Sequence, residues 1–226
     1  MISVCVPSRI RPQNMSRLVE SVYATSTTPV EVLFRLDLDD EASIVEAVRL
    51  GMTYPMVRHV AAERGVLSDL WNDAAAISTG EILMMCGDDI VFRTADWDKK
   101  VLDAFDQYPD RIALVYGNDL IQHERLATHP FIHRRWYEAV GYLVPNGFSC
   151  DWCDMWLNEV AIALGRRHYL PDVITEHMHP VMGKARLDES HRERIARGRR
   201  DNVRALYEAR ADERAADVEK LKAVMA

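Results

Sequence analysis

An apolar run that ends in two adjacent carboxylates is the feature that most limits what this chain can fold into. Residues 82–86, Ile-Leu-Met-Met-Cys, lie between Gly80 and Gly87 and are followed at once by Asp88 and Asp89. A short apolar run bounded by glycines, without polar alternation, is typical of a strand buried on both faces of a parallel sheet. Carboxylates beside such a core are costly to desolvate unless cations or donors compensate them. The sequence therefore predicts a metal ion or a helix N-terminus next to this pair.

Strand-like and helix-like segments alternate through the first half of the chain. The pattern predicts strands at 2–6, 30–36, 56–60 and 82–86, separated by helices around residues 15–22, 42–50 and 67–78. This alternation indicates a parallel α/β sheet with right-handed crossovers. Open sheets of this kind bind ligands beyond the carboxyl ends of their strands, which is where Asp88 and Asp89 would lie.

The second half is predicted to contain further elements and a helical tail. We expect a helix at 96–108, a strand at 112–116, a loop-rich stretch at 117–146, a helix at 154–164 and a strand within 168–180. Residues 188–226 are rich in Arg, Glu and Ala and are predicted to be helical, with a basic first half. The expected division is a main domain at 1–186 and a helical extension at 187–226.

Composition limits the class of protein without choosing a partner. A chain of 226 residues with 48% hydrophobic residues is large enough for a sizeable core. The formal net charge of -7 argues against a protein that coats nucleic acid by bulk charge. We find no signal peptide and no membrane-spanning run, and the four scattered cysteines favour reduced thiols in a cytoplasmic protein.

The order of these motifs resembles the GT-A glycosyltransferases, especially the large inverting group called family 2, over roughly residues 2–180. Members open with a strand and a Pro-Thr/Ser-x-x-Arg turn, matched here within VPSRIRP, and place an acidic residue after the second strand, matched within LDLDD. The resemblance implies the GT-A fold, a Rossmann-like, mostly parallel α/β sheet flanked by helices. It also implies a set of residues that bind the donor nucleotide: Pro7, Ser8, Arg9, Arg11, Asp37, Asp39, Asn72 and Asp88.

The resemblance also implies a site for Mn²⁺ or Mg²⁺. The Asp-x-Asp signature of the family falls on Gly87-Asp88-Asp89, so glycine replaces its first aspartate and Asp89 becomes the first choice as ligand. The family often adds a histidine after its last strand, which implies His177, with His179 as the alternative; the two would point to the same face of a strand. A simpler interpretation is that the aspartates cap a turn and that the histidines lie on the surface.

The segment CDWCDMWLNEVAIALG matches the region in which the family carries its catalytic base. The resemblance implies Asp154 as the aspartate that deprotonates the acceptor hydroxyl, with Cys153 where members have glutamate, and Asp151 as the alternative. Either carboxylate is also a good cap for the following helix. The Cys150-x-x-Cys153 pair lacks the second ligand pair of a zinc site.

Aromatic residues in the second half are candidates for the acceptor site. The loop at 123–141, which contains His129, His133 and Trp136, occupies the position where such enzymes bind the acceptor, and Trp152 follows it. Aromatic faces stack on sugars or bases, but the same residues are frequent in cores. The acceptor candidates are Trp136, His133 and Trp152.

Three functions follow from these residues. The first is a metal-dependent, inverting glycosyltransferase that uses a nucleotide-sugar donor, with a UDP-sugar favoured. Its acceptor is a glycan or, because the tail is arginine-rich, a hydroxylated base in DNA as in some phage-type enzymes. The second is a nucleotidyltransferase on a similar fold, and the third is a non-catalytic module that binds nucleotide-sugars. The sequence predicts no membrane partner and leaves the oligomeric state open.

Overall fold

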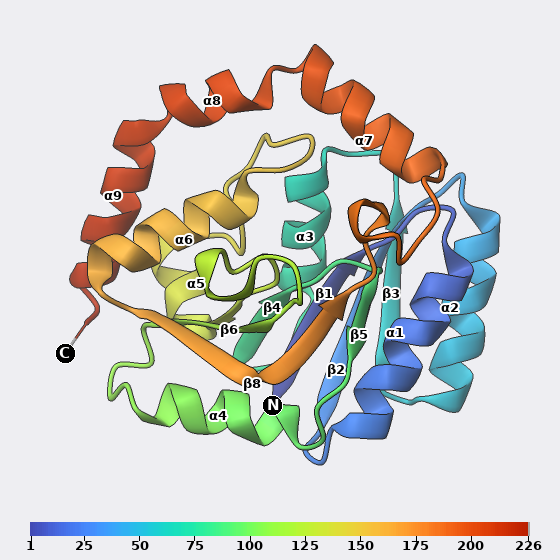
Figure 1. Ribbon diagram of the computed structural model, residues 1–226, viewed down its shortest axis with the longest axis horizontal. Coiled ribbons are helices and arrows are strands. Elements are labelled where there is room, and N and C mark those ends of the chain that lie inside the picture. The colour runs from blue at the N-terminus through green and yellow to red at the C-terminus, as the bar shows by residue number, and fades with distance from the viewer. Residues whose placement is uncertain (226) are drawn as a thin grey trace.

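Eight strands within residues 1–225, the part of the chain that this computed structural model describes, form one mixed sheet with helices on both faces (Figure 1). Their order in space is β3-β2-β1-β4-β7-β6-β8-β5. The strands are β1 (Ile2–Pro7), β2 (Val30–Asp37), β3 (Val57–Ala62), β4 (Ile82–Met85), β5 (Ile90–Phe92), β6 (Leu114–Asn118), β7 (Phe131–His133) and β8 (Arg167–His177). The helices are α1 (Pro12–Thr25), α2 (Glu41–Thr53), α3 (Leu67–Ala76), α4 (Trp97–Asp106), α5 (Arg134–Val140), α6 (Cys153–Leu164), α7 (Glu189–Arg200), α8 (Val203–Ala209) and α9 (Ala211–Lys222).

The first half of the sheet is the parallel α/β arrangement that the sequence predicts. β1 pairs in parallel with both β2 and β4, and β2 pairs in parallel with β3. All residues of β1, β2 and β4 are buried, because helices cover both faces of these strands. The carboxyl ends of the four strands therefore meet at one edge of the sheet.

The second half of the sheet is mixed, which the sequence pattern does not predict. β7 lies antiparallel between β4 and β6, β8 is parallel to β6, and β5 is antiparallel to β8. The expectation of a loop-rich stretch at 117–146 is wrong in part, because this segment contains β7 and α5. β5 and β7 have only three residues each, too few for a periodic pattern, and their pairing partners are distant in sequence.

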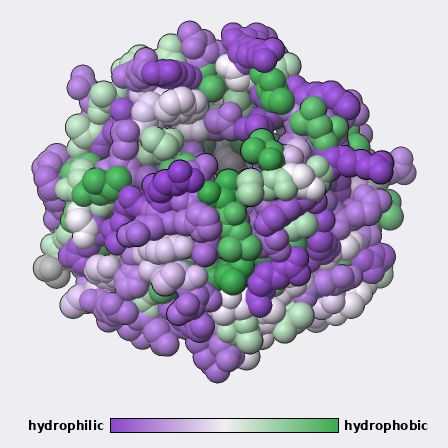
Figure 2. Space-filling model, viewed as in Figure 1, coloured by the Kyte–Doolittle hydropathy of each residue, from purple (hydrophilic) through white to green (hydrophobic). Residues whose placement is uncertain are grey.

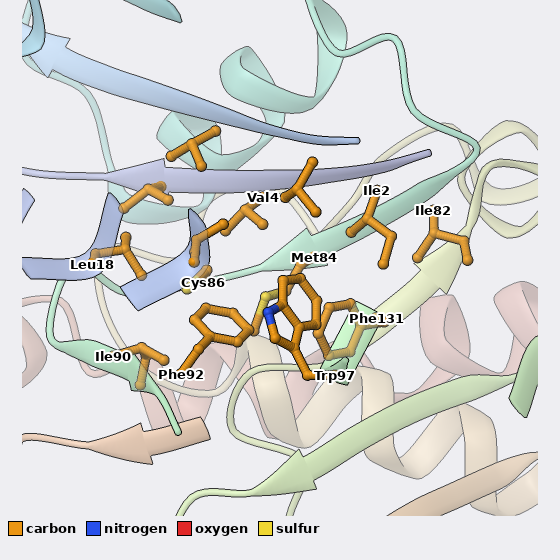
Figure 3. Close-up of a cluster of buried hydrophobic side chains, with 14 of the residues drawn as sticks. Ile2, Val4, Leu18, Ile82, Met84, Cys86, Ile90, Phe92, Trp97 and Phe131 are labelled. Atoms are coloured by element: carbon orange, nitrogen blue, oxygen red, sulfur yellow. The ribbon is translucent and has the colours of Figure 1, made fainter. Parts of the chain in front are cut away.

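Two hydrophobic cores lie on opposite faces of the sheet. One packs α1, α2 and α4 against the strands, and there Trp97 lies between Phe92 and Phe131, with ring centroids 4.3 and 5.8 Å away (Figure 3). The other packs α3, α5, α6 and α9 and contains Trp136 and Trp156. Cys5, Cys86, Cys150 and Cys153 are free and buried.

The C-terminal segment is helical, as predicted, and α7, α8 and α9 form an arc along one edge of the molecule (Figure 1). α9 ends the arc against α6, where the buried carboxylate of Asp217 accepts hydrogen bonds from Trp156 Nε1 at 3.0 Å and from the Tyr142 hydroxyl. α7 begins the arc beside the carboxyl ends of the strands. Across residues 1–225, every helix is too short or too polar to cross a membrane.

Candidate active site

A cleft of about 280 Å³ opens at the carboxyl ends of β1, β2 and β4. The molecular surface is hollowed in the upper central part of Figure 2, near the position of α3 and α7 in Figure 1. The wall of the cleft is completed by α3, the segment before β7, the start of α6, the end of β8 and the start of α7. Of the residues selected from the sequence, the lining includes Pro7, Ser8, Arg9, Arg11, Asp37, Asp88, Asp89, Asp151, Asp154, His177 and His179.

The turn after β1 binds the first of the two adjacent carboxylates. Ser8 Oγ donates a hydrogen bond to Asp88 at 2.7 Å, and Arg11 Nη1 donates to the same carboxylate at 3.0 Å. Burial raises the pKa of Asp88, and the charge of Asp89 adds to this effect while Arg11 opposes it. Both carboxylate oxygens of Asp88 thus already have partners from the Pro-Ser-x-x-Arg turn.

The end of β2 provides an acidic group on the other side of this turn. Arg9 Nη1 lies 3.0 Å from Asp37 and 2.7 Å from Asp39. Burial raises the pKa of Asp37, which faces the cleft, although Arg9 opposes the shift. Asp39 is half exposed, also binds Arg64, and lies outside the cleft lining. Asp37 is therefore the carboxylate of this loop that faces the cleft.

Asp89 and His177 meet because β5 and β8 are paired. In this antiparallel pair Ile90 lies opposite His177, and the Met178 amide donates to the Asp89 carbonyl at 2.8 Å. His177 Nε2 lies 3.4 Å from Asp89 Oδ2. Burial alone would raise the pKa of Asp89, but the hydrogen bond and charge of His177 hold it below its usual range. The carboxylate is therefore ionised and faces an imidazole.

His129, which the sequence analysis places only in the acceptor loop, joins this pair. β4 and β7 pair in the register Met84 to Phe131, and extending that register by two residues places His129 opposite Cys86. The Gly87 amide lies 3.3 Å from His129 Nδ1. One ligand atom each of Asp89, His129 and His177 lies within 4.8 Å of the others. No local motif reveals His129, because only the pairing of β4 with a strand about 47 residues later brings it here.

The second candidate metal histidine, His179, lines the cleft but is not one of the three residues whose ligand atoms lie within 4.8 Å of one another. Its ring is 5.1 Å from that of His177, and its side chain accepts a hydrogen bond from the Val181 amide at the start of a short 3₁₀ turn, η2 (Pro180–Met182). Of the two histidines, His177 is the one placed with Asp89.

The two candidate bases lie at the start of α6 in different environments. Asp154 is in the first turn of the helix, faces the cleft and accepts a hydrogen bond from the Met155 amide at 2.8 Å. Burial raises the pKa of Asp154 to about 6, and nearby Asp151 acts in the same direction. Asp151 is half exposed and forms an ion pair with Arg194 of α7. The structure thus separates a half-buried carboxylate, with no cationic partner among the described residues, from an exposed one that already pairs with Arg194.

Four other selected residues lie outside the cleft lining and have other contacts in the structure. Asn72 binds the backbone of Leu143 and Val144 and so holds the loop before α6. Trp136 is only 1% exposed within the core between α3, α5 and α6. His133 lies opposite Ile82, at the far end of β4 from Asp88, and caps α5. Trp152 packs on Tyr207 with ring centroids 4.7 Å apart.

An α/β sheet with helices on both faces and an acidic cleft at the carboxyl ends of its strands is typical of nucleotide-binding α/β enzymes. The model of the family described as "Glycosyl transferase family 2" matches residues 3–163. The chain belongs to glycosyl transferase family 2. The predicted GT-A fold and the predicted class of enzyme, a glycosyltransferase, are thereby confirmed.

Solved structures share this fold at low sequence identity. A mannosyltransferase from Pyrobaculum calidifontis, in complex with GDP-Man and Mn²⁺, matches with a TM-score of 0.64 and 16% identity over 99% of this chain and 73% of that one. Glucosyl-3-phosphoglycerate synthase from Mycobacterium tuberculosis, in complex with Mn²⁺, UDP and glucosyl-3-phosphoglycerate, matches with a TM-score of 0.59 and 13% identity over 81% and 75% of the two chains.

A curated relative matches part of the sequence. The glucosyl-dolichyl phosphate glucuronosyltransferase of Haloferax volcanii is 27% identical over 140 residues, which cover 62% of this chain and 44% of the relative. The chain thus spans less than half the length of that relative.

Proposed function

We propose that this protein transfers a sugar from a nucleotide-sugar donor to an acceptor hydroxyl with inversion, assisted by a divalent cation. One observation carries the proposal: Asp37, Asp89 and Asp154 come from three separate elements and face a single cleft. Each has the chemistry of a different role, namely nucleotide recognition, cation binding and general base catalysis.

The donor is proposed to lie across the carboxyl ends of β1, β2 and β4. Asp37 would accept hydrogen bonds from the base or ribose, while Arg9 and Arg11, which flank the cleft, place positive charge near the diphosphate. A UDP-sugar is the first donor to test. Relatives in the same fold supply one complex with UDP and one with GDP-Man, which supports a nucleotide diphosphate in general.

The residues around Asp89 fit a divalent cation. His129 Nε2 is buried and has no hydrogen-bond partner among the described residues, while Asp89 and His177 approach it from two other elements. A cation bound there, Mn²⁺ or Mg²⁺, would offset the negative charge that grows on the leaving diphosphate. The chain's part is to present one carboxylate and two imidazoles on elements held by the sheet.

Asp154 is proposed as the base that removes the acceptor proton. Its carboxylate faces the cleft, and its raised pKa of about 6 suits a group that must take a proton near neutral pH. Inversion needs one such base on the face of the sugar opposite the leaving group. Asp151 is less suited, because Arg194 already binds it.

The acceptor enters from the α6 and α7 side of the cleft in this proposal. A glycan hydroxyl and a hydroxylated base in DNA are the two acceptor classes to compare. Several arginines of the tail already have acidic partners, including Arg194 with Asp151 and Arg204 with Glu208, which reduces the charge available for a phosphate backbone. These ion pairs favour the glycan.

The test is turnover of nucleotide-sugars. The full chain is incubated with UDP-, GDP- and dTDP-sugars and Mn²⁺, with and without EDTA, and release of the nucleoside diphosphate is followed. Release that EDTA abolishes supports the proposal. Formation of pyrophosphate from a sugar phosphate and a nucleoside triphosphate would instead indicate a nucleotidyltransferase, and tight donor binding without turnover would indicate a binding module. Either result overturns the proposal.

A further inference from the structure

We propose that the cleft binds its cation through two imidazoles and one carboxylate, with His129 in place of the carboxylate that Gly87 lacks. The full set of ligands from the chain is Asp89, His129 and His177. This inference rests on the proposed function for the presence of a cation, and it adds a ligand that the sequence motif does not contain. It also predicts which ion the cleft prefers.

The three side chains approach the spacing of a metal site. Their ligand atoms lie within 4.8 Å of one another. Two donor atoms on the same ion, each about 2.1 Å from it, lie at most about 4.2 Å apart. In this proposal, changes in side-chain rotamers bring the three donor atoms onto the ion. The residues are held by the β4–β7 and β5–β8 pairings, so the arrangement is set by the sheet.

The glycine at position 87 explains why an imidazole occupies this place. A Cβ atom added to Gly87 would lie 2.7 Å from Asp89 Oδ1 and 3.3 Å from His129 Cε1. A side chain at position 87 and the ring of His129 would thus compete for the same space. The Asp-x-Asp motif would place its first carboxylate at position 87. With glycine at this position, the ring of His129 can lie where that side chain would be.

His129 presents a buried ring nitrogen to this group. Nε2 is the ring nitrogen without a hydrogen-bond partner among the described residues, and Nδ1 lies 3.3 Å from the Gly87 amide. Cation binding at Nε2 requires the ring proton on Nδ1, so this long contact from the Gly87 amide is lost when the ion binds.

The other carboxylate of the motif, Asp88, already has hydrogen-bond partners within the protein. Asp88 accepts hydrogen bonds from Ser8 and Arg11 through its two oxygens. The chain therefore offers one oxygen ligand and two nitrogen ligands. Mg²⁺ favours oxygen ligands in octahedral geometry, whereas imidazole suits divalent ions of the first transition series. We expect the cleft to prefer Mn²⁺ or Co²⁺ to Mg²⁺.

The experiment measures binding of Mn²⁺ alone to the full chain, without donor. Titration by electron paramagnetic resonance should show Mn²⁺ bound at least about tenfold more tightly than Mg²⁺ in competition. Pulsed measurements on the bound Mn²⁺ should show couplings to two imidazole nitrogens. In His129→Gln one coupling should disappear and the Mn²⁺ affinity should fall by about 10- to 100-fold.

Matched variants identify which histidines are ligands. His168→Gln changes another partly buried histidine of β8, which contacts Tyr108 far from Asp89 along the strand, and should leave affinity and couplings unchanged. His179→Gln should keep both couplings. Adding Gly87→Asp to His129→Gln should restore binding through a carboxylate and shift the preference towards Mg²⁺.

Two results would overturn the inference. One is a single nitrogen coupling in the wild-type protein, a measurement that does not depend on whether any variant folds. The other is an unchanged pair of couplings in His129→Gln. The proposed function is tested separately. Two nitrogen couplings without turnover of any nucleotide-sugar would refute the transferase and leave the metal site standing. Turnover with a single nitrogen coupling would refute the three-residue metal site and leave the transferase standing.

Discussion

The guanidinium of Arg11 lies 3.0 Å from the carboxylate of Asp88, and both side chains are largely buried. The same guanidinium binds Asp188, the N-cap of α7, at 2.8 Å. A single cation from the turn after β1 thus joins the acidic end of β4 to a helix that begins about 100 residues later. This ion pair orders one wall of the cleft even without a ligand.

Replacing Arg11 with alanine should destabilise the protein by about 3 kcal/mol, because Asp88 would remain buried without its cation. Urea unfolding at pH 7 measures the change. Arg49→Ala removes a surface ion pair with Glu46 and should cost less than about 1 kcal/mol. Adding Asp88→Asn to Arg11→Ala should recover part of the loss. Equal stability of the two single arginine variants would contradict this account.

Replacing Asp154 with asparagine should lower kcat by about 10²- to 10⁴-fold and leave donor binding nearly unchanged, because only the proton acceptor is lost. The wild-type rate should also fall as the pH drops below about 6, since the raised pKa of Asp154 means that protonation there removes the base. Rates of nucleoside diphosphate release from pH 5 to 8 measure both effects. Asp151→Asn is the control, with an expected loss under about tenfold. A larger loss in Asp151→Asn would reassign the base.

Asp98 should make stability depend on pH in the acidic range. Burial alone would raise the pKa of Asp98, but hydrogen bonds from the Thr27 and Thr28 amides hold it below its usual value. A lowered pKa in the folded state gives stability that is present above the unfolded pKa of about 4 and is lost as the pH falls through the folded value. Asp98→Asn should therefore cost about 1–2 kcal/mol at pH 7 and progressively less below pH 4. A pH-independent difference in urea unfolding would refute the assignment.

Asp217 should be important for attaching the C-terminal arc to the rest of the protein. Asp217→Ala leaves the Trp156 indole N–H and the Tyr142 hydroxyl without their shared acceptor inside the protein. Each unsatisfied buried group costs about 1–3 kcal/mol, so a total loss near 3 kcal/mol is expected in thermal or urea unfolding. Glu219→Ala, on the exposed side of α9, should change stability by less than about 0.5 kcal/mol. Similar losses in the two variants would show that Asp217 is not the anchor.

The sequence predicted the parts of the fold that have a local pattern. The buried run at 82–86 and the alternation before it identify β1 to β4 with their helices, and the composition of the tail identifies α7 to α9 as helical. Most of the site residues that it selected line the cleft, because polar residues that follow buried strands collect at one edge of a parallel sheet. Asn72 and Trp136 lie outside the cleft lining, and local sequence does not show this because side chains that hold loops or fill a core have the same chemistry as ligand-binding ones.

What the sequence determined by itself is the parallel strands of the first half and the position of Asp88 and Asp89 at their carboxyl ends. Tertiary structure decided which partners the side chains of the cleft have. Arg11 and Ser8 bind Asp88, leaving Asp89 free, and the antiparallel pairing of β7 with β4 brings His129 to the space that Gly87 leaves open. The physical reason is that hydrogen-bonding partners and ligand sets depend on pairings between distant strands, and local sequence patterns do not record those pairings.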